Sequence, residues 1–391
     1  MTSSALTLIT LGLLFLLGLV AEFLGRTTLV PRVSILIVFG FCIGPSGFNV
    51  LPEEAGKWLP IVSDMALVLI GVVLGSSLKW SALKNSGRLV LGMVFSVVII
   101  TLLIMSVGIW VAGFSIQLAL LYAGIALATA PATTLDVIHE SKAHGSFTDS
   151  LLKIVATADA LGLIVFSIMV AVTQMMINSG GGLDIIFVGG RDIFLAVLVG
   201  VLLGLPMSYL AGRVKPGEPT LLEVLGLVFI CGGVSLWLDV SFLLAAMTMG
   251  VVVANMARHH NCPLCAIETI KTIKWPILAL FFIFAGVSIE LEDVSKNALL
   301  IILYIVFRIA GRLIGSMAGA KVVGVDKSYG QWMGMALMPQ AGIALGMALT
   351  AAHRFPELGS IVTVIATATV FFEIVGPVFT RIALHRMGDV L

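Results

Sequence analysis

This sequence has few charged residues: Asp, Glu, Lys and Arg together occupy only 11% of its 391 positions. A soluble globular chain of ordinary composition carries about 25%, so the low charge excludes a chain with an ordinary water-facing surface. The formal net charge is +1, which leaves no basic excess for binding nucleic acid. Both shortages indicate a protein whose solvent is lipid.

Cysteine is also scarce, and the four cysteines of the chain do not form a disulfide framework. Two of them stand in a C-x-x-C pair next to two histidines, in ARHHNCPLCAIE. This cluster has two interpretations, a metal or redox site or a short loop beside a membrane. We favour the loop, because no second pair completes a tetrahedral site. The residues concerned are His259, His260, Cys262 and Cys265.

Apolar stretches of about 20 residues recur along the whole chain, each long enough to cross a bilayer as a helix. The first lacks the basic start and the cleavage site of a signal peptide, so we expect it to remain in the mature protein. The sequence predicts an all-α polytopic membrane protein in one unit, residues 1–391, without a soluble domain. The thirteen expected transmembrane helices cover residues 5–24, 33–50, 59–78, 89–111, 116–138, 150–177, 192–212, 221–237, 240–257, 269–289, 298–320, 329–351 and 358–380.

Lysine and arginine are distributed unevenly between the two sides that these spans define. Sixteen of the 22 lie on the side of the C-terminal tail and four lie on the other side. The remaining two, Arg308 and Arg312, fall inside the eleventh span. Because positively charged loops tend to stay in the cytoplasm, we expect a cytoplasmic C-terminus and an N-terminus on the outer side.

Two spans carry a proline near their middle. The fifth reads AGIALATAPATTLDVI around Pro131, and the twelfth reads MGMALMPQAGIALGMAL around Pro339, Gln340 and Gly342. Proline lacks an amide donor and clashes with the carbonyl four residues earlier, and broken backbone at membrane depth must be buried or line a cavity. Since the two spans run in opposite directions, they predict inverted-topology repeats with a binding site at the crossing. The alternative is two ordinary proline kinks.

Asp159 lies about nine residues into the sixth span, in TADALGLIVFS, and therefore ~13 Å deep at ~1.5 Å per residue. A carboxylate at that depth is costly and marks a functional site. The alternative is a misplaced helix end, with the carboxylate among the lipid headgroups. Burial favours its protonated form and a bound cation favours its ionised form, so this one residue suffices to exchange a proton for a cation.

Two arginines and a glutamate are the other charges at depth. Arg312 lies halfway along the eleventh span, and Arg308 lies one turn earlier on the same face. We expect one of them to pair with Asp159 when no cation is bound, unless Arg308 extends to the membrane surface. Glu373, in VFFEIVGPVF, is either a second proton or ion site or a structural carboxylate that pairs with an arginine or caps broken backbone. We favour the structural role.

Five segments follow one another along the chain: ALATAPATTLDV, TADALGLIVFS, FFIFAGVSIEL, AGRLIG and MGMALMPQAGIALG. Together they resemble the cation:proton antiporter superfamily, which includes the sodium/proton exchangers. The first and last resemble its two broken helices, the second its ion-site helix, and the third its F-F-x-x-x-G helix. In AGRLIG, Arg312 matches the position of the family's Lys or Arg. The resemblance covers nearly the whole chain.

The resemblance implies a sodium/proton antiporter fold, a homodimer in the bilayer, and an elevator movement that exposes Asp159 to each side in turn. It implies a transport core of about 89–177 and 298–380, and dimerisation helices of about 5–50 and 192–257. Asp159 would bind Na⁺ or K⁺, with Pro339, Gln340 and Gly342 in the second arm of the crossing. The remaining oxygen ligands would come from side chains or freed carbonyls of Thr129, Ala130, Pro131, Thr133 and Thr157.

Two positions depart from the family pattern. Ala158 precedes Asp159 where relatives carry Asp, Asn or Gln, and Ala130 stands where A-T-D-P motifs carry Asp. The resemblance then implies one carboxylate where electrogenic relatives have two, and hence electroneutral exchange. Arg312 in place of Lys agrees with this. Hard oxygen ligands favour Na⁺, Li⁺ or K⁺ over a soft metal.

We therefore expect a monovalent cation/proton antiporter of a prokaryotic inner membrane, first of all an electroneutral Na⁺/H⁺ exchanger, without enzymatic activity or cofactor. A K⁺/H⁺ antiporter is an alternative, less favoured because no Gly-rich nucleotide fingerprint follows the last span. A sodium-coupled transporter of organic anions is another, in which Arg308 and Arg312 hold a carboxylate. The third is a membrane sensor that transports nothing.

Overall fold

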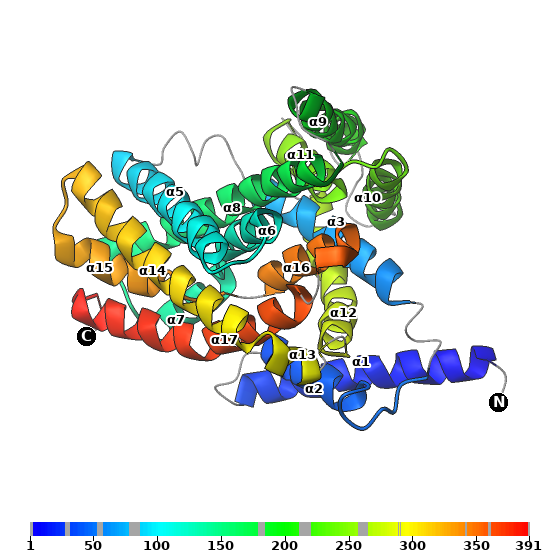
Figure 1. Ribbon diagram of the computed structural model, residues 1–391. Coiled ribbons are helices and arrows are strands. Elements are labelled where there is room, and N and C mark those ends of the chain that lie inside the picture. Colours follow the sequence, from blue (N-terminus) through cyan, green and yellow to red (C-terminus); the bar gives the residue numbers. More distant parts are fainter. Residues whose placement is uncertain are drawn as a thin grey trace. The chain divides into compact units, whose positions relative to one another are not determined.

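The computed structural model describes residues 3–27, 32–52, 58–77, 87–178, 184–210, 220–256, 265–287, 289, 291–340, 342–358 and 361–389. Within these residues the regular structure consists of sixteen α-helices and one short 3₁₀-helix (Figure 1), so the predicted all-α architecture is confirmed. The helices are α1 (Ser3–Thr27), α2 (Arg32–Ile43), α3 (Leu59–Ser77), α5 (Arg88–Val111), α6 (Ile116–Ala126), α7 (Pro131–Glu140), α8 (Ser146–Asn178), α9 (Asp184–Leu210), α10 (Thr220–Trp237), α11 (Phe242–Met256), α12 (Cys265–Val287), α13 (Leu291–Lys296), α14 (Ala298–Val323), α15 (Lys327–Ala336), α16 (Gly342–Arg354), η2 (Pro356–Leu358) and α17 (Ile361–Arg386).

Each of the thirteen expected spans overlaps one helix, or two helices in the case of the fifth and twelfth spans. Five of the described helices, α1, α5, α8, α14 and α17, are long and apolar enough to cross a membrane alone. The second span was expected to be longer than it is. α2 ends at Ile43, because Gly44 and Pro45 begin a turn there. α8 begins earlier than expected, at Ser146.

The chain divides into two compact units. Unit 1 consists of Met1–Glu53, Ser86–Phe166 and Phe282–Leu391, and unit 2 of Glu54–Asn85 and Ser167–Phe281. In unit 2, α11 packs against α3, α9 and α10. Unit 1 contains the two proline-interrupted spans, α14, α17 and the half of α8 that carries the buried aspartate. The expected division into a transport core and dimerisation helices remains a prediction.

Glycines spaced four residues apart allow α14 to lie directly against α5 (Figure 1). A Cβ atom at Gly311 would lie 2.8 Å from the Cα of Thr101, and one at Gly315 would lie 2.8 Å from the Cα of Val97. Gly319 continues the series one turn later. Small residues at this spacing bring membrane helices into backbone contact. The helix that carries both buried arginines is thereby held against its neighbour along several turns.

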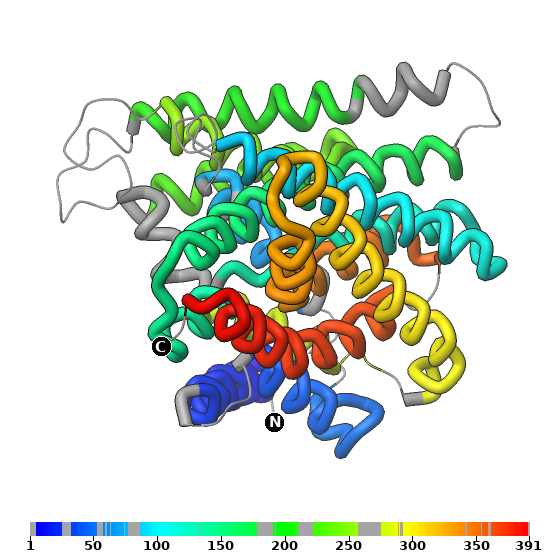
Figure 2. Tube along the Cα trace, turned by 90° about the vertical axis from the view of Figure 1, so that its left-hand side faces the viewer, coloured from blue at the N-terminus to red at the C-terminus, as the bar shows by residue number. Residues whose placement is uncertain are grey.

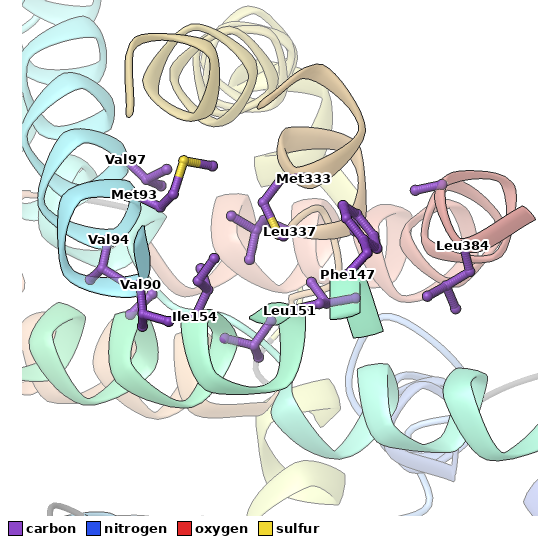
Figure 3. Packing of buried hydrophobic residues seen from close by; sticks show 14 of the residues in the cluster. Val90, Met93, Val94, Val97, Phe147, Leu151, Ile154, Met333, Leu337 and Leu384 are labelled. Carbon is purple, nitrogen blue, oxygen red and sulfur yellow. The ribbon is translucent and has the colours of Figure 1, made fainter. Parts of the chain in front are cut away.

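A cluster of buried apolar side chains surrounds the first half of α8. Figure 3 shows Ile154 of α8 between Val90 of α5 and Leu337, which follows α15. The cluster continues to Ala158, the residue immediately before Asp159. Because this packing leaves little room for water, Asp159 lies at the margin of a dry core.

The N-terminus of α8 is capped by a residue from the other end of the chain. α17 packs against α15 (Figures 1 and 2) and is followed by Asp389, whose carboxylate accepts the amide and the hydroxyl of Thr148, both at 2.7 Å. The carbonyl of Asp389 accepts the amide of His144 at 2.9 Å. A carboxylate here satisfies an unpaired amide and complements the positive end of the helix dipole. These contacts fix the position of the helix that carries Asp159.

The glycine contact between α14 and α5 can be tested by adding one methyl group. We expect Gly315→Ala to lower the apparent melting temperature of the detergent-solubilised protein by several degrees, because the Cβ meets backbone atoms that do not yield. The matched control is Gly226→Ala on α10, where a Cβ meets no atom within 4 Å. There alanine should leave the melting temperature unchanged or raise it. Equal melting temperatures for the two variants would contradict the packing argument.

Candidate functional site

Both proline-containing spans are interrupted where the sequence predicts. Residues 127–130 separate α6 from α7 and residues 337–340 lie between α15 and α16, all of them buried and outside any helix. Ala130 is the capping residue of α7, and Pro131 occupies its first turn, where the missing amide costs no hydrogen bond. The alternative of two simple kinks is therefore wrong, because each helix stops and restarts.

The second interruption is hydrogen-bonded to the last turn of α6, directly before the first interruption. The Gln340 side chain donates to the carbonyl of Ile125, in the last turn of α6, at 3.4 Å and to the hydroxyl of Tyr304 at 2.9 Å. Gly342 begins α16 two residues later. The predicted crossing of two broken helices is therefore present, with Pro339 and Gln340 in its second arm.

Arg308, fully buried on α14, donates to carbonyls of both interruptions. It reaches the carbonyl oxygens of Ala128 at 2.9 Å and Ala126 at 3.3 Å in the first, and that of Met338 at 2.8 Å in the second. Its guanidinium carbon lies 4.2 Å from the ring centre of Phe372, within the range of a cation–π interaction. The alternative in which Arg308 extends to the membrane surface is therefore wrong.

Arg312, one turn further along α14, is fully buried as well. Its Nη2 atom lies 3.0, 2.6 and 3.1 Å from the carbonyl oxygens of Ala126, Leu127 and Ala128. These carbonyls have no partner within a helix, and at membrane depth there is no bulk water to solvate them. The arginines thus supply the hydrogen bonds that the interruption would otherwise lack.

Asp159 is 3% exposed and lies beside the first interruption. Its Oδ1 atom accepts the backbone amide of Thr129 at 3.1 Å, and the Thr129 hydroxyl donates to the carbonyl of Val155 at 3.2 Å. The depth inferred from the sequence agrees with this burial. The expected ion pair is not formed: among the described residues, no nitrogen of Arg308 or Arg312 lies within 4.0 Å of the Asp159 carboxylate.

The threonines expected around Asp159 are placed unequally. Thr129 is buried and contacts the carboxylate through its amide. Thr133 is half-buried in the first turn of α7. Thr157 stands two residues before Asp159 on α8, so its side chain leaves the helix on another face, and its hydroxyl donates to the carbonyl of Lys153 at 2.7 Å. The structure therefore brings Thr129 to Asp159 and leaves Thr157 apart.

Glu373 on α17 is 2% exposed and accepts a hydrogen bond from the hydroxyl of Ser34 on α2, within the same unit. Among the described residues, no arginine forms an ion pair with Glu373. The bond joins α17 to α2, which agrees with a structural role for this carboxylate. Its serine partner, instead of an arginine, was not expected.

Two residues of the crossing were missed in the sequence. Tyr304 accepts from Gln340, and Phe372 faces the Arg308 guanidinium. Tyr304 could have been found in the sequence. Tyr304, Arg308 and Arg312 recur every four residues and so share one face of an otherwise apolar helix. Phe372 had none, since an apolar side chain on a membrane helix is unremarkable. His259, His260 and Cys262 of the cysteine cluster, and the side chain of Cys265, lie outside the described residues.

The comparison with protein families agrees with this geometry. Residues 9–385 match the model described as the transmembrane part of the sodium/hydrogen exchanger. The chain belongs to the sodium/hydrogen exchanger family. It is a multi-pass membrane protein and a cation/proton antiporter of that family, as the resemblance in its five segments predicted.

Two individual proteins illustrate the relationship. The ammonium/H⁺ antiporter subunit AmhT of Alkalihalophilus pseudofirmus is 24% identical over 354 residues, which cover 90% of this chain and 88% of the relative. Among solved structures, the sodium proton antiporter MjNhaP1 of Methanocaldococcus jannaschii, determined at pH 8, matches with a TM-score of 0.75. The match covers 97% of this chain and 98% of the other at 18% identity, so it shows that the exchanger fold is shared.

The hydrogen bond between Ser34 and Glu373 separates the two interpretations of that carboxylate. Ser34→Ala leaves a buried carboxylate without its donor, at a cost of about 1–3 kcal/mol, so we expect a lower melting temperature. The control is Ser235→Ala, a buried serine whose hydroxyl donates to the Cys231 carbonyl of its own helix. If Glu373 is structural, Glu373→Gln keeps cation-dependent proton flux. Loss of flux in a folded Glu373→Gln protein would instead make it a second ion site.

Proposed function

We propose that this protein exchanges one Na⁺ for one proton, and that Asp159 holds each of them in turn. The observation that carries the proposal is a single buried carboxylate hydrogen-bonded to the interruption of a broken helix. Asp159 is nearly dry and touches the one part of α6–α7 whose backbone is not engaged in a helix. It is therefore a carboxylate that must be neutralised by a proton or by a cation whenever it leaves water.

The charge at the crossing supports electroneutral exchange. Arg308 and Arg312 are held by carbonyl groups and stay charged in every state, since a guanidinium is not deprotonated in proteins. Asp159 is the carboxylate that contacts the crossing. A proton and a monovalent cation each neutralise one charge there, so the two loaded forms carry the same net charge. The membrane potential then does not favour one direction of exchange.

The identity of the cation has a second candidate. The carbonyls of Ala126, Leu127 and Ala128, at the end of α6 and the start of the interruption, already accept hydrogen bonds from arginines. These three carbonyls are therefore not free to bind a small, strongly hydrated ion such as Na⁺. Ammonium and K⁺ are larger and less strongly hydrated than Na⁺, so they need fewer protein oxygens to replace their water. AmhT is named as a subunit of an ammonium/H⁺ antiporter. Exchange of ammonium or K⁺ for a proton is accordingly the alternative.

The setting of this exchange belongs to the same proposal. We place the protein in a prokaryotic inner membrane as a homodimer, with its N-terminus outside and its C-terminus in the cytoplasm. The transport core, about 89–177 and 298–380, moves as an elevator relative to the dimerisation helices. The uneven distribution of lysine and arginine supports the orientation of the termini, and the dimer and the elevator movement are what the family resemblance implies.

The exchange is tested by proton flux in proteoliposomes with a preset pH gradient. We expect one of Na⁺, Li⁺, K⁺ or NH₄⁺ to collapse the gradient with wild-type protein and not with Asp159→Asn. Protein-free vesicles correct for ammonia that crosses the lipid by itself. A valinomycin/K⁺ voltage clamp should leave the rate with Na⁺, Li⁺ or NH₄⁺ unchanged if exchange is electroneutral.

Other results would point to the rival functions. If no monovalent cation moves protons through folded wild-type protein, the proposal fails, and sodium uptake stimulated by organic anions becomes the next measurement. If neither protein moves ions in vesicles, and wild-type and Asp159→Asn proteins give the same phenotype in cells, the non-transporting sensor is favoured. A rate that changes under the voltage clamp would overturn electroneutrality and leave the exchange itself intact.

A further inference from the structure

We propose that Arg308 and Arg312 act on Asp159 through one peptide group, the amide that joins Ala128 to Thr129, and not through an ion pair. This inference rests on the proposed function, because it concerns how the exchanging carboxylate is kept available. It makes the two arginines positioning residues for the ion site and assigns a functional role to a single backbone amide.

The contacts at the two ends of this peptide group carry the inference. Its carbonyl oxygen, on Ala128, accepts Arg308 Nη2 at 2.9 Å and Arg312 Nη2 at 3.1 Å. Its amide, on Thr129, donates to Asp159 Oδ1 at 3.1 Å. A trans peptide group points its C=O and N–H in opposite directions, so two cations lie at one end and the carboxylate lies at the other.

The electrostatics of this arrangement favour the ionised carboxylate. The peptide dipole runs from the carbonyl oxygen, next to the guanidinium groups, to the amide hydrogen, next to Asp159. Hydrogen bonds in a chain polarise one another, and the effect is larger in a low-dielectric interior. The charge of the arginines is thus passed to Asp159 through a donor that cannot move away, because the arginines hold its carbonyl.

The arrangement also leaves the carboxylate free to bind its substrates. A direct ion pair would place a guanidinium on the oxygens that a proton or cation must reach. Here Asp159 Oδ1 accepts the Thr129 amide, and the Nη2 atoms of Arg308 and Arg312 bond peptide carbonyls instead of the carboxylate. Arg312 Nε and Nη1 are buried and have no hydrogen-bond partner among the described residues. No acceptor anion therefore cancels the charge of Arg312 before it acts on the peptide group.

A double-mutant cycle with a backbone change tests the relay. Replacing the 128–129 amide by an ester, with the α-hydroxy analogue of threonine at position 129, removes the N–H and leaves every side chain in place. The second change is Arg312→Gln, chosen because Arg308 also holds the other interruption. Two controls match them: the same ester at Thr248 of α11, in unit 2, and Arg381→Gln, an exposed arginine near Glu140.

We expect each change to raise the apparent KM for the transported cation about tenfold at a fixed pH, with the maximal rate within about threefold of wild type. The reason is that the proton and the cation compete for one carboxylate, and a less stabilised ionised form gives the proton the advantage. The apparent KM of the double variant should also be about tenfold above that of wild type, because both changes interrupt the same relay. Arg312→Lys, which keeps the charge, should restore most of the affinity, and both controls should match wild type.

The outcomes separate this inference from the proposed function. If wild-type protein exchanges no cation, the proposed function fails first. If wild-type protein exchanges normally and the apparent KM of the double variant rises about a hundredfold, the two effects are independent. The relay is then overturned, and the proposed function stands. An ester at position 129 with wild-type KM would also overturn it. Should Arg312→Gln not fold, the ester at position 129 is measured in the Arg312→Lys protein. The relay predicts the same rise in KM there as in wild type, about tenfold, and an unchanged KM overturns it.

Discussion

The rest of this structure depends on how the carbonyl groups of two interrupted membrane helices are satisfied. Each interruption frees backbone acceptors in a region without bulk water, where an unpaired polar group costs several kcal/mol on the scale of transfer to an apolar medium. Arg308 donates hydrogen bonds to carbonyls of both interrupted helices, and Arg312 contacts three carbonyls of the first interrupted helix. Two buried positive charges are thereby stabilised by backbone dipoles, and the interruptions keep one geometry.

The surrounding packing serves to hold these arginines and the aspartate at fixed positions. Glycines of α14 bring its backbone against α5, so the helix that carries both arginines is closely held. Asp389 caps the start of α8, and apolar side chains fill the space up to Ala158 (Figure 3). Phe372 covers the Arg308 guanidinium from α17. Contacts from elements distant in sequence thus fix the two arginines and the helix that carries Asp159.

If Asp159 is the exchange site, as we propose, this organisation explains how one carboxylate suffices. Cations fixed beside Asp159 would either occupy it as an ion pair or leave it as costly unpaired charge. The structure has a third arrangement, in which the guanidinium groups bond peptide carbonyls, and in our proposal they act on Asp159 through the Ala128–Thr129 amide. A site of this kind stays accessible to a proton or a cation. The carbonyls of Ala126, Leu127 and Ala128 already accept arginines, so in our proposal the carboxylate and the nearby Thr129 hydroxyl select among monovalent cations.

Much of the fold was determined by the sequence alone. Hydropathy over about 20 residues predicts spans, and Pro131 and Pro339 predict where two of them break, because both are local properties of the backbone and its solvent. Asp159 was identifiable as the candidate site for the same reason, since a charge in an apolar run has no local explanation. Only the tertiary structure decided the partners: that Arg308 and Arg312 hold carbonyls and not the aspartate, that Glu373 meets Ser34, and that Thr157 faces elsewhere. A guanidinium bonds whichever acceptor the fold brings to it, and here that acceptor lies 180 residues away in the chain.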